Sequence, residues 1–254
     1  MRIATWNLEW ARPGSDRHRR CREHLESLDA DVVVTTEDSL HEWSAFPHRI
    51  DGGPDWGYPV VEGRRKVIAW SRRPWTHVSV GSTRSTAGRL VVGSTGVAPA
   101  GGDRDGVGAD GRGDVIPVAV RVVGVCIPWS ASHVSTGRRD LRRWEDHLAF
   151  CEELGRTVAT SSQSGAPIIV AGDVNQRIPR TRQPHHVADA LTVALGGLAV
   201  PSAGEQATGR LIDHVAVGGG ISATAVSTWP NEIDGRRLSD HGGVLVDVEL
   251  AASD

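Results

Sequence analysis

A carboxylate and a carboxamide follow a short apolar run in the second half of the chain. Residues 168–171 are Ile, Ile, Val and Ala, and Gly172 separates this run from Asp173 and Asn175. Such a run is typical of a strand covered on both faces, and side chains two positions apart at its end point the same way. Asp173 and Asn175 could therefore contact one ligand. The alternative is a simple turn, because both residue types readily bond to their own backbone.

Acidic or amide side chains also mark the other predicted strands. Residues 2–6 and 31–36 are short strand-like runs, and further strand-like segments lie at 211–217 and 244–250. Polar groups at the ends of, or inside, such apolar segments are costly unless they are paired or coordinated. One shared site would account for the whole set: Asn7, Glu9, Glu37, Asp173, Asn175, Asp213, Asp240 and His241.

A site for a divalent metal ion and a phosphate group fits these side chains. Glu37, with one or both of Glu9 and Asp240, supplies hard oxygen ligands of the kind that Mg²⁺ and Mn²⁺ accept. Water and substrate oxygens would complete the coordination. Zinc is disfavoured, because the sequence shows no paired His or Cys signature.

Acid–base roles can be assigned to the remaining groups. His241 could protonate or stabilise a phosphoryl oxygen, oriented by a carboxylate such as that of Asp213. Asp173 could then orient and deprotonate the attacking water. Taken singly, each acidic residue is more often a helix cap or a surface charge, and a lone histidine is more often structural. The hypothesis therefore depends on the set as a whole.

A serine hydrolase is a poor alternative. Ser239, Asp240 and His241 are consecutive, and neighbouring residues on an extended segment face opposite ways, so they cannot form a triad with one another. The G-x-S-x-G motif of the nucleophile elbow does not occur in the sequence.

Alternating strands and helices must position these residues. Apolar residues recur every three or four positions along one predicted helix: Leu141, Trp144, Leu148, Cys151, Leu154 and Val158. Strands at 115–127 and 168–173 flank this helix and form a strand–helix–strand unit. The other predicted helices span 16–28 and 187–195. Short strands at 60–61, 67–71, 78–80 and 90–92 favour a meander, and 39–57 is expected to be a loop anchored by Trp43 and Trp56.

Length and composition narrow the class of protein. The 254 residues suit one domain spanning 1–254, with a flexible Gly- and Asp-rich loop at 96–114. A net charge of -3 lacks the broad basic face of a general duplex binder. No apolar run approaches the roughly 20 residues of a membrane span, and the N-terminal sequence lacks a secretory signal, which predicts a cytoplasmic protein. Three widely spaced cysteines predict reduced thiols.

Five short motifs stand in the order that is typical of one known family. They are Trp6-Asn7-Leu8-Glu9, Thr36-Glu37, Gly172-Asp173-Val174-Asn175, Ile212-Asp213-His214 and Ser239-Asp240-His241. Together they resemble the endonuclease/exonuclease/phosphatase superfamily, whose members share the deoxyribonuclease I-like fold. The resemblance implies an α/β protein, a four-layered α/β/β/α sandwich of two mixed sheets flanked by helices. It also implies divalent-metal-dependent hydrolysis of a phosphodiester or phosphomonoester.

Matching positions carry the family's site residues onto this sequence. The resemblance implies metal ligands at Glu37, Glu9 and Asp240, phosphate-orienting amides at Asn7 and Asn175, a water-directing carboxylate at Asp173, and a catalytic histidine at His241 with its partner Asp213.

One position departs from the family. Where members usually have His or Tyr at the end of the strand before the long helix, this chain has Cys126. A thiol is a weak hydrogen-bond donor, so Ser130 or His133 could substitute for the missing phosphate contact. The departure bears on the substrate class and on the rate.

The substrate is indicated less directly than the reaction. Arg177 follows the Asp173 motif and could hold a phosphate or a nucleic-acid backbone, although a solvated loop is the simpler interpretation. Trp129 could stack on a base, or be a core residue. We predict a phosphoesterase that uses Mg²⁺ or Mn²⁺, with nuclease activity favoured over small-molecule or lipid phosphodiesterase or phosphatase activity. A catalytically silent phosphate-binding domain is the alternative of another class. No protein partner is inferred.

Overall fold

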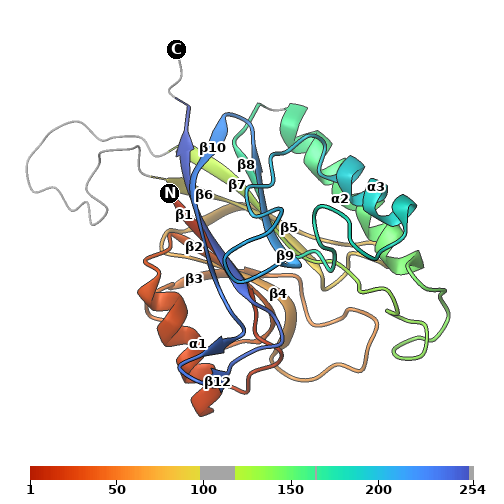
Figure 1. Cartoon of the computed structure of the whole chain (residues 1–254), viewed down its shortest axis with the longest axis horizontal. Helices are drawn as coiled ribbons and strands as arrows, with labels where there is room; N and C mark the ends of the chain where they lie inside the picture. The colour runs from red at the N-terminus through yellow and green to blue at the C-terminus, as the bar shows by residue number, and fades with distance from the viewer. Residues whose placement is uncertain (98–117, 164, 252–254) are drawn as a thin grey trace, which may run out of the picture.

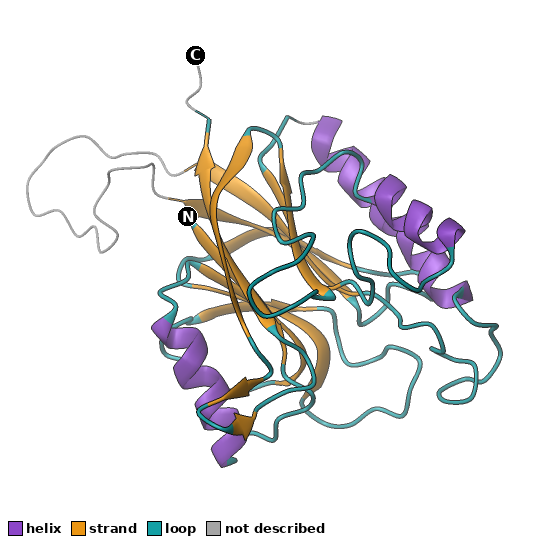
Figure 2. Cartoon of the chain, viewed as in Figure 1, coloured by secondary structure: helices purple, strands orange, loops and turns teal. Residues whose placement is uncertain are grey.

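Two β-sheets pack against each other, and helices cover their outer faces (Figure 1). The computed structural model describes residues 1–97, 118–163 and 165–251. Helix α1 (Asp16–Ser27) lies outside one sheet, and α2 (Glu145–Gln163) and α3 (His185–Ala194) lie together outside the other (Figure 2). The predicted four-layered α/β/β/α sandwich is confirmed.

The first sheet is mixed and has six strands. In sheet order they are β10 (Ile221–Trp229), β13 (Gly243–Leu250), β1 (Arg2–Asn7), β2 (Val32–Ser39), β4 (Arg64–Ser71) and β3 (His48–Asp51). Strands β1 and β2 are parallel, and their register places Asn7 beside Thr36. The polar residues that follow these two strands therefore emerge at the same end of the sheet.

The second sheet has five strands. In sheet order they are β5 (Trp75–Val80), β6 (Leu90–Val97), β7 (Val118–Cys126), β8 (Ile168–Asp173) and β9 (Asp213–Gly218). Strands β7 and β8 are parallel and are joined through α2, which confirms the predicted strand–helix–strand unit. Asp173 pairs in register with Cys126 on one side and with Asp213 on the other. A separate two-stranded sheet joins β11 (Glu232–Ile233) and β12 (Arg236–Arg237).

Three hydrophobic clusters hold the layers together. The cluster between the sheets is built mainly from β-branched residues, such as Val34, Val122 and Ile169, which suit a pleated surface. A second cluster joins the five-stranded sheet to α2 and α3 and includes Phe150 and Leu154. The third packs α1 against the six-stranded sheet. The strands are thus fixed from both faces, and the polar groups at their ends are held by a rigid frame.

Gly172 is needed where β8 passes β7. Its φ is +144°, and a Cβ atom at this position would lie 1.9 Å from the carbonyl oxygen of Val125. A side chain would force the two strands apart. The glycine therefore allows Asp173 to lie directly beside the end of β7.

Several element boundaries differ from the sequence-based predictions. Residues 48–51 form β3 inside the predicted loop 39–57, whereas 60–61 are not a strand and carry two exposed valines. Strand β10 was missed, because its residues 222–225 are small and all exposed, so it has neither a buried apolar run nor an alternating pattern. Helix α2 begins at Glu145 rather than near 141, since Trp144 has a φ of +69° and ends any helical path there.

Other expectations concern the loop at 96–114, the cysteines and the membrane. Strand β6 extends through Val97, and the remainder of the predicted loop lies outside the described residues. The cysteines are free and buried, as predicted. Within the described residues, no helix combines the length and the apolar character needed to cross a membrane.

Candidate active site

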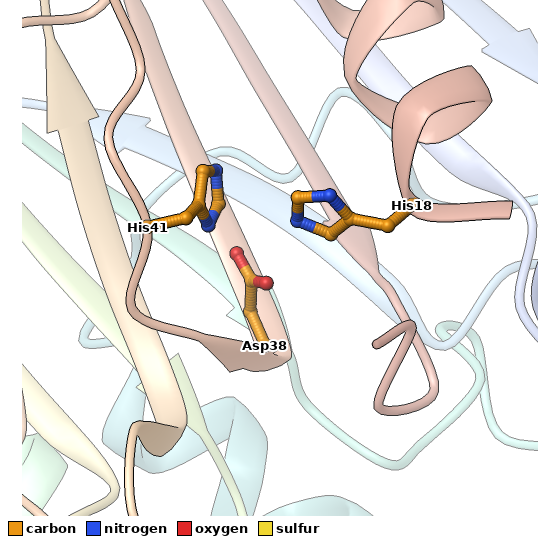
Figure 3. Close-up of side chains that lie close together, drawn as sticks. All are labelled: His18, Asp38 and His41. Carbon is orange, nitrogen blue, oxygen red and sulfur yellow. The ribbon is translucent and has the colours of Figure 1, made fainter. Parts of the chain in front are cut away.

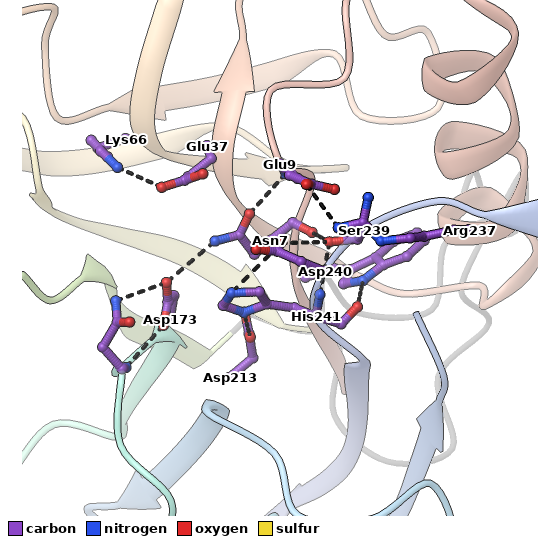
Figure 4. A network of polar contacts seen from close by, with 12 residues as sticks. Asn7, Glu9, Glu37, Lys66, Asp173, Asp213, Arg237, Ser239, Asp240 and His241 are labelled. Carbon is purple, nitrogen blue, oxygen red and sulfur yellow. Dashed lines mark hydrogen bonds and ion pairs between the residues drawn. The ribbon is translucent and has the colours of Figure 1, made fainter. Parts of the chain in front are cut away.

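The polar residues of both sheets meet at one end of the sandwich (Figure 4). Asn7 ends β1 and Glu37 lies near the end of β2, both in the six-stranded sheet. Asp173 ends β8 and Asp213 begins β9, both in the five-stranded sheet. His241 precedes β13 and joins this group. The site is therefore built from both sheets, which explains why its residues are scattered along the chain.

Asp173 is held by two amides. Its Oδ2 accepts hydrogen bonds from Nδ2 of Asn7 at 3.2 Å and from Nδ2 of Asn175 at 3.0 Å. Its Oδ1 accepts from the backbone N–H of Asn175 at 2.9 Å, and Asn175 also donates to the carbonyl of Ile127 at 2.8 Å. The structure thus brings Asn7, Asp173 and Asn175 together, and it fixes the carboxylate in one orientation.

The environment of Asp173 makes it a candidate base. Burial raises the pKa of its carboxyl to about 7, the carboxylates of Asp213 and Glu37 also raise it, and the nearby His241 opposes them. A carboxylate whose pKa lies near neutrality can accept a proton from water and release it again.

His241 is paired with Asp213. Its Nδ1 donates to Oδ2 of Asp213 at 2.5 Å, and its Nε2 lies 3.7 Å from Oδ1 of Asp240. Burial alone would lower the pKa of His241, but the carboxylates of Asp213, Asp173 and Asp240 raise it to about 10. The imidazole is therefore cationic at neutral pH, and it is suited to donate a proton or to stabilise negative charge.

Two residues that the sequence analysis did not assign to the site position His241. The Ser239 hydroxyl donates to the carbonyl of Asn7 at 2.6 Å and accepts from the backbone N–H of His241 at 3.1 Å. The indole of Trp6 donates to the carbonyl of His241 at 2.8 Å. These contacts tie the segment before β13 to the end of β1. Ser239 was considered only as a nucleophile, and no signal in the sequence indicates this bridging role.

All three predicted metal ligands form ion pairs, and Asp240, which pairs with His241, is also exposed. Glu37 contacts the ammonium of Lys66 at 2.5 Å, and Glu9 contacts Arg17 at 3.0 Å and Arg237 at 2.8 Å. Among the described residues, two groups of three residues have candidate ligand atoms within 4.8 Å of one another. Neither group contains Glu37, Glu9 or Asp240.

The donor chemistry nevertheless fits a divalent cation. Asp173, Asp213 and His241 form one of the two groups of three, and Oδ1 of Asp213 is buried without a hydrogen-bond partner among the described residues. Glu37 lies at the other end of the same network from Asp213, bound to the ammonium of Lys66 (Figure 4). Lys66 is the only lysine in the chain. The antiparallel register of β2 and β4 brings it beside Glu37, and the sequence alone does not predict this register.

The backbone at the site is strained at the predicted residues. Glu9, Glu37 and Asn175 have φ angles of +46°, +49° and +52°. Residues other than glycine adopt this left-handed region at a cost of roughly 1–2 kcal/mol each. Such strain is concentrated at functional sites, where the surrounding structure maintains it.

Cys126 lies beside Asp173, in the position where the resemblance leads us to expect His or Tyr. It is 2 % exposed, and burial raises the pKa of its thiol to about 12, so the thiol stays protonated at neutral pH. A protonated thiol offers a phosphate group only a weak donor.

The two proposed substitutes for that contact lie in the loop that follows β7. His133 is fully buried, its Nδ1 accepts from the backbone N–H of Arg138 at 3.1 Å, and its ring lies 4.7 Å from that of Tyr58. It therefore packs between its own loop and Tyr58, and none of these contacts is with Asp173. Ser130 accepts a hydrogen bond from Arg143 at 3.3 Å.

The remaining predicted substrate residues are exposed. Trp129 is 46 % exposed and follows the segment whose Ile127 carbonyl bonds Asn175, so it stands at the edge of the site. Arg177 is exposed two residues beyond Asn175.

A family model describes the same span of chain. The model of the Endonuclease/Exonuclease/phosphatase family matches residues 4–241. The chain belongs to this family. Family membership makes the protein a phosphoester hydrolase, and the family generally uses divalent metal ions. No curated protein matches the sequence.

Solved structures share the fold at low sequence identity. An endonuclease/exonuclease/phosphatase from Bacteroides vulgatus is 14% identical with a TM-score of 0.65, over 98% of each chain. An AP endonuclease from Archaeoglobus fulgidus is 15% identical with a TM-score of 0.64, over 98% of this chain and 100% of that one. A 3'-5' exonuclease from Neisseria meningitidis is 15% identical with a TM-score of 0.63, over the same shares of the two chains.

A buried histidine anchors the segment that follows Asn175. Nδ1 of His147 donates to the carbonyl of Pro128 at 2.7 Å, and Nε2 accepts from Gln176 at 2.6 Å. The same Gln176 amide donates to the carbonyl of Val187 at 3.0 Å. This arrangement requires a neutral imidazole, and burial lowers the pKa of His147 to about 4.

We expect this histidine to make folding sensitive to acid. Because the pKa of His147 is lower in the folded protein than the ordinary 6.5, the unfolded chain binds more protons between pH 6.5 and 4, and stability falls as pH falls through that window. The free energy of unfolding should lose about 2–3 kcal/mol there. In urea unfolding at several pH values, the wild type should lose about 2–3 kcal/mol more stability over this window than His147→Gln does. The exposed His186→Gln variant should behave like the wild type. Parallel profiles for wild type and His147→Gln would contradict the prediction.

Proposed function

We propose that this family member is a phosphodiesterase that uses Mg²⁺ or Mn²⁺ and acts preferentially on nucleic acid. The observation that carries the proposal is that the site holds two ionisable groups, a carboxyl and an imidazole, whose surroundings raise both pKa values. Asp173 has a pKa raised to about 7, and His241 has a pKa raised to about 10. A base and a cationic donor are thus present together at neutral pH, as hydrolysis by water requires.

Each protein group has a defined part in the proposed reaction. Asp173 accepts a proton from water, whose oxygen forms a bond to phosphorus while the bond to the leaving oxygen breaks. Nε2 of His241 faces the site while Nδ1 is held by Asp213, so its N–H donates to a phosphoryl oxygen and stabilises the added charge. Asn7 and Asn175 keep the Asp173 carboxylate oriented.

The metal ion would be held on the Glu37 side of the site. We infer that Glu37 is its principal ligand, with Glu9 and Asp240 as further oxygen donors. When bound, a divalent cation polarises a phosphoryl oxygen and lowers the pKa of coordinated water. Before it binds, Glu37 must exchange its contact with Lys66 for the cation.

Cationic and aromatic side chains beside the site support a polyanionic substrate. The ring of Trp10 lies 4.8 Å from the Arg64 guanidinium carbon and 5.2 Å from the Lys66 ammonium, and it stacks on Trp56. On the other side, Trp129 is exposed and available for stacking. The similar structures described as an AP endonuclease and a 3'-5' exonuclease are consistent with a nucleic-acid substrate.

A panel of phosphate esters tests this function together with its metal requirement. Single-stranded DNA, duplex DNA, RNA, nucleotides and phospholipid head-group esters would each be incubated with the protein and Mg²⁺ or Mn²⁺. We expect hydrolysis of at least one nucleic acid, its loss in excess EDTA, and its recovery when Mg²⁺ or Mn²⁺ is restored. Turnover confined to nucleotides or lipid esters would favour the small-molecule alternative. Binding without turnover on every substrate would favour a silent phosphate-binding domain, and activity in excess EDTA would refute the metal role.

A further inference from the structure

A second group of possible metal ligands lies behind the six-stranded sheet, under α1. His18 comes from α1, Asp38 from the end of β2 and His41 from the segment that follows β2. One ligand atom of each residue lies within 4.8 Å of the other two. Figure 3 shows the Asp38 carboxylate and the two imidazole rings converging on one small region. The proposed catalytic groups use none of these three side chains.

Both imidazoles have nitrogen atoms without a hydrogen-bond partner. His18 is 3 % exposed, and its Nε2 is buried without a hydrogen-bond partner among the described residues. Nε2 of His41 is likewise buried and has no partner among those residues. Buried polar atoms in folded proteins nearly always have a partner. Imidazole nitrogens without partners in a group that also holds a fully buried carboxylate indicate that a cation belongs in this group.

Groups around the cluster orient its members as in a metal site. Nδ1 of His41 lies 2.7 Å from the carbonyl oxygen of Ser39, which fixes the ring and leaves its other nitrogen with a lone pair. The Asp38 carboxylate accepts from the Thr35 hydroxyl at 2.8 Å and from the Ser39 backbone N–H at 2.7 Å. Ligands that are held by hydrogen bonds to a second ring of groups are typical of bound metal ions.

The chemistry of the three ligands selects a transition metal rather than Mg²⁺. Two imidazoles and one carboxylate are ligands that suit zinc. The aromatic rings of Trp43 and Trp70 lie 5.7 and 4.8 Å from that of His41, which is half-buried, and a water molecule would complete a tetrahedral site. The guanidinium groups of Arg22 and Arg49 oppose positive charge here, and each is paired with a carboxylate, Arg22 with Glu26 at 3.5 Å and Arg49 with Glu42 at 3.9 Å.

We propose that His18, Asp38 and His41 bind one zinc ion that fastens α1 to the end of β2. A bound zinc ion would draw the three ligand atoms to roughly 3.3 Å from one another. No motif in the sequence predicts this site, because the ligands do not form a compact His or Cys motif. Asp38 adjoins Glu37, so the zinc ion would also stiffen the backbone that presents the proposed Mg²⁺ ligand.

Zinc content is the direct test. The full-length protein would be stripped with a chelator, returned to buffer with excess Mg²⁺, given a small excess of zinc and passed through a desalting column before elemental analysis. We expect one zinc ion per chain in the wild type, with its affinity weakened at least 100-fold in His18→Gln and in His41→Gln. Zinc should also raise the Tm of the wild type and leave that of His18→Gln unchanged.

The chain supplies two matched controls. His24 lies on the same helix and also has a buried Nε2 without a partner, but it packs against Trp6 and Trp229 instead of a carboxylate. His24→Gln should therefore bind zinc like the wild type. His241→Gln tests the other group of three and should also keep the zinc ion. Failure of the zinc proposal would leave the phosphodiesterase proposal untouched, because the two rest on different residues.

Two results would overturn the proposal. One is a wild-type protein that retains no zinc; the other is zinc that persists in His18→Gln and disappears in His241→Gln. If a histidine variant does not fold, cobalt substitution in the wild type still decides the matter. A tetrahedral nitrogen–oxygen site gives visible absorption bands with Co²⁺ that zinc displaces, and the absence of these bands would contradict the proposal.

Discussion

Replacing Asp173 by asparagine should lower kcat for phosphodiester hydrolysis by about 10²–10⁴-fold. Asparagine matches the carboxylate in shape, but it has one acceptor oxygen in place of two, so it loses part of the hydrogen bonding from Asn7 and Asn175 and cannot take a proton from water. Since the substrate contacts lie elsewhere, KM should change much less than kcat. Steady-state kinetics at saturating Mg²⁺ on the best substrate of the panel would measure both constants.

The same substitution should change how stability depends on pH. The folded-state pKa of Asp173 is raised from 3.8 to about 7, so between these values the folded protein binds more protons than the unfolded chain, and this carboxyl makes stability fall as pH rises. Measured in EDTA, the stability of the wild type relative to Asp173→Asn should therefore decrease by about 2–4 kcal/mol from pH 4 to pH 8.

A carboxylate remote from the site provides the control. Asp247 in β13 pairs with Arg2 at 2.7 Å, and Asp247→Asn should retain the activity and the pH dependence of the wild type. An Asp173→Asn variant with wild-type kcat would remove Asp173 from the mechanism. Lost activity with an unchanged pH dependence of stability would instead show that the pKa of Asp173 is not raised in the folded protein.

The strands and the identity of the polar set could be predicted because both depend on local pattern. Apolar runs that end in carboxylates or amides identified the ends of β1, β2 and β8. Even the alternative of a simple turn after β8 describes a real contact, since the Asn175 backbone N–H bonds Oδ1 of Asp173. The turn and the proposed catalytic role are therefore compatible, because the turn is what fixes the carboxylate.

The missed features depend on contacts between distant segments. The pairing of Lys66 with Glu37 requires the register of two antiparallel strands. The Ser239 hydroxyl reaches the Asn7 carbonyl across 232 positions of sequence, and the His18 cluster forms only when α1 packs on the six-stranded sheet. No local period encodes these contacts. Strand β10 was missed for a related reason, since a strand with an outward polar face lacks a continuous apolar run.

Replacing Glu37 by glutamine should separate metal binding from the rest of the site. A neutral amide is a weaker ligand for a hard cation than a carboxylate, so we expect the Mg²⁺ concentration for half-maximal activity to rise at least tenfold. At about 1 mM Mg²⁺, kcat/KM should fall by about 10²–10⁴-fold, as expected when a charge-stabilising group is lost. Circular dichroism and Tm should show an intact fold, because Glu37 lies near the end of β2 and is only partly buried. A Mg²⁺ dependence like that of the wild type would refute its role as a ligand.

Lys66→Met should act in the opposite direction on the same equilibrium. The ammonium lies 2.5 Å from Oε1 of Glu37 and must give up this contact when a cation binds, so its removal frees the carboxylate and removes a repulsive charge. Half-saturation should then need about tenfold less Mg²⁺, a gain of about 1.4 kcal/mol. Arg65→Met removes the same charge from the adjacent position in β4, where the guanidinium pairs with Asp51 at 2.7 Å, and it should leave Mg²⁺ binding unchanged. If Lys66→Met and Arg65→Met have equal effects, general electrostatics rather than the Glu37 contact controls metal binding. If Lys66→Met binds Mg²⁺ more tightly but loses kcat, the freed ammonium also stabilises the reacting phosphate.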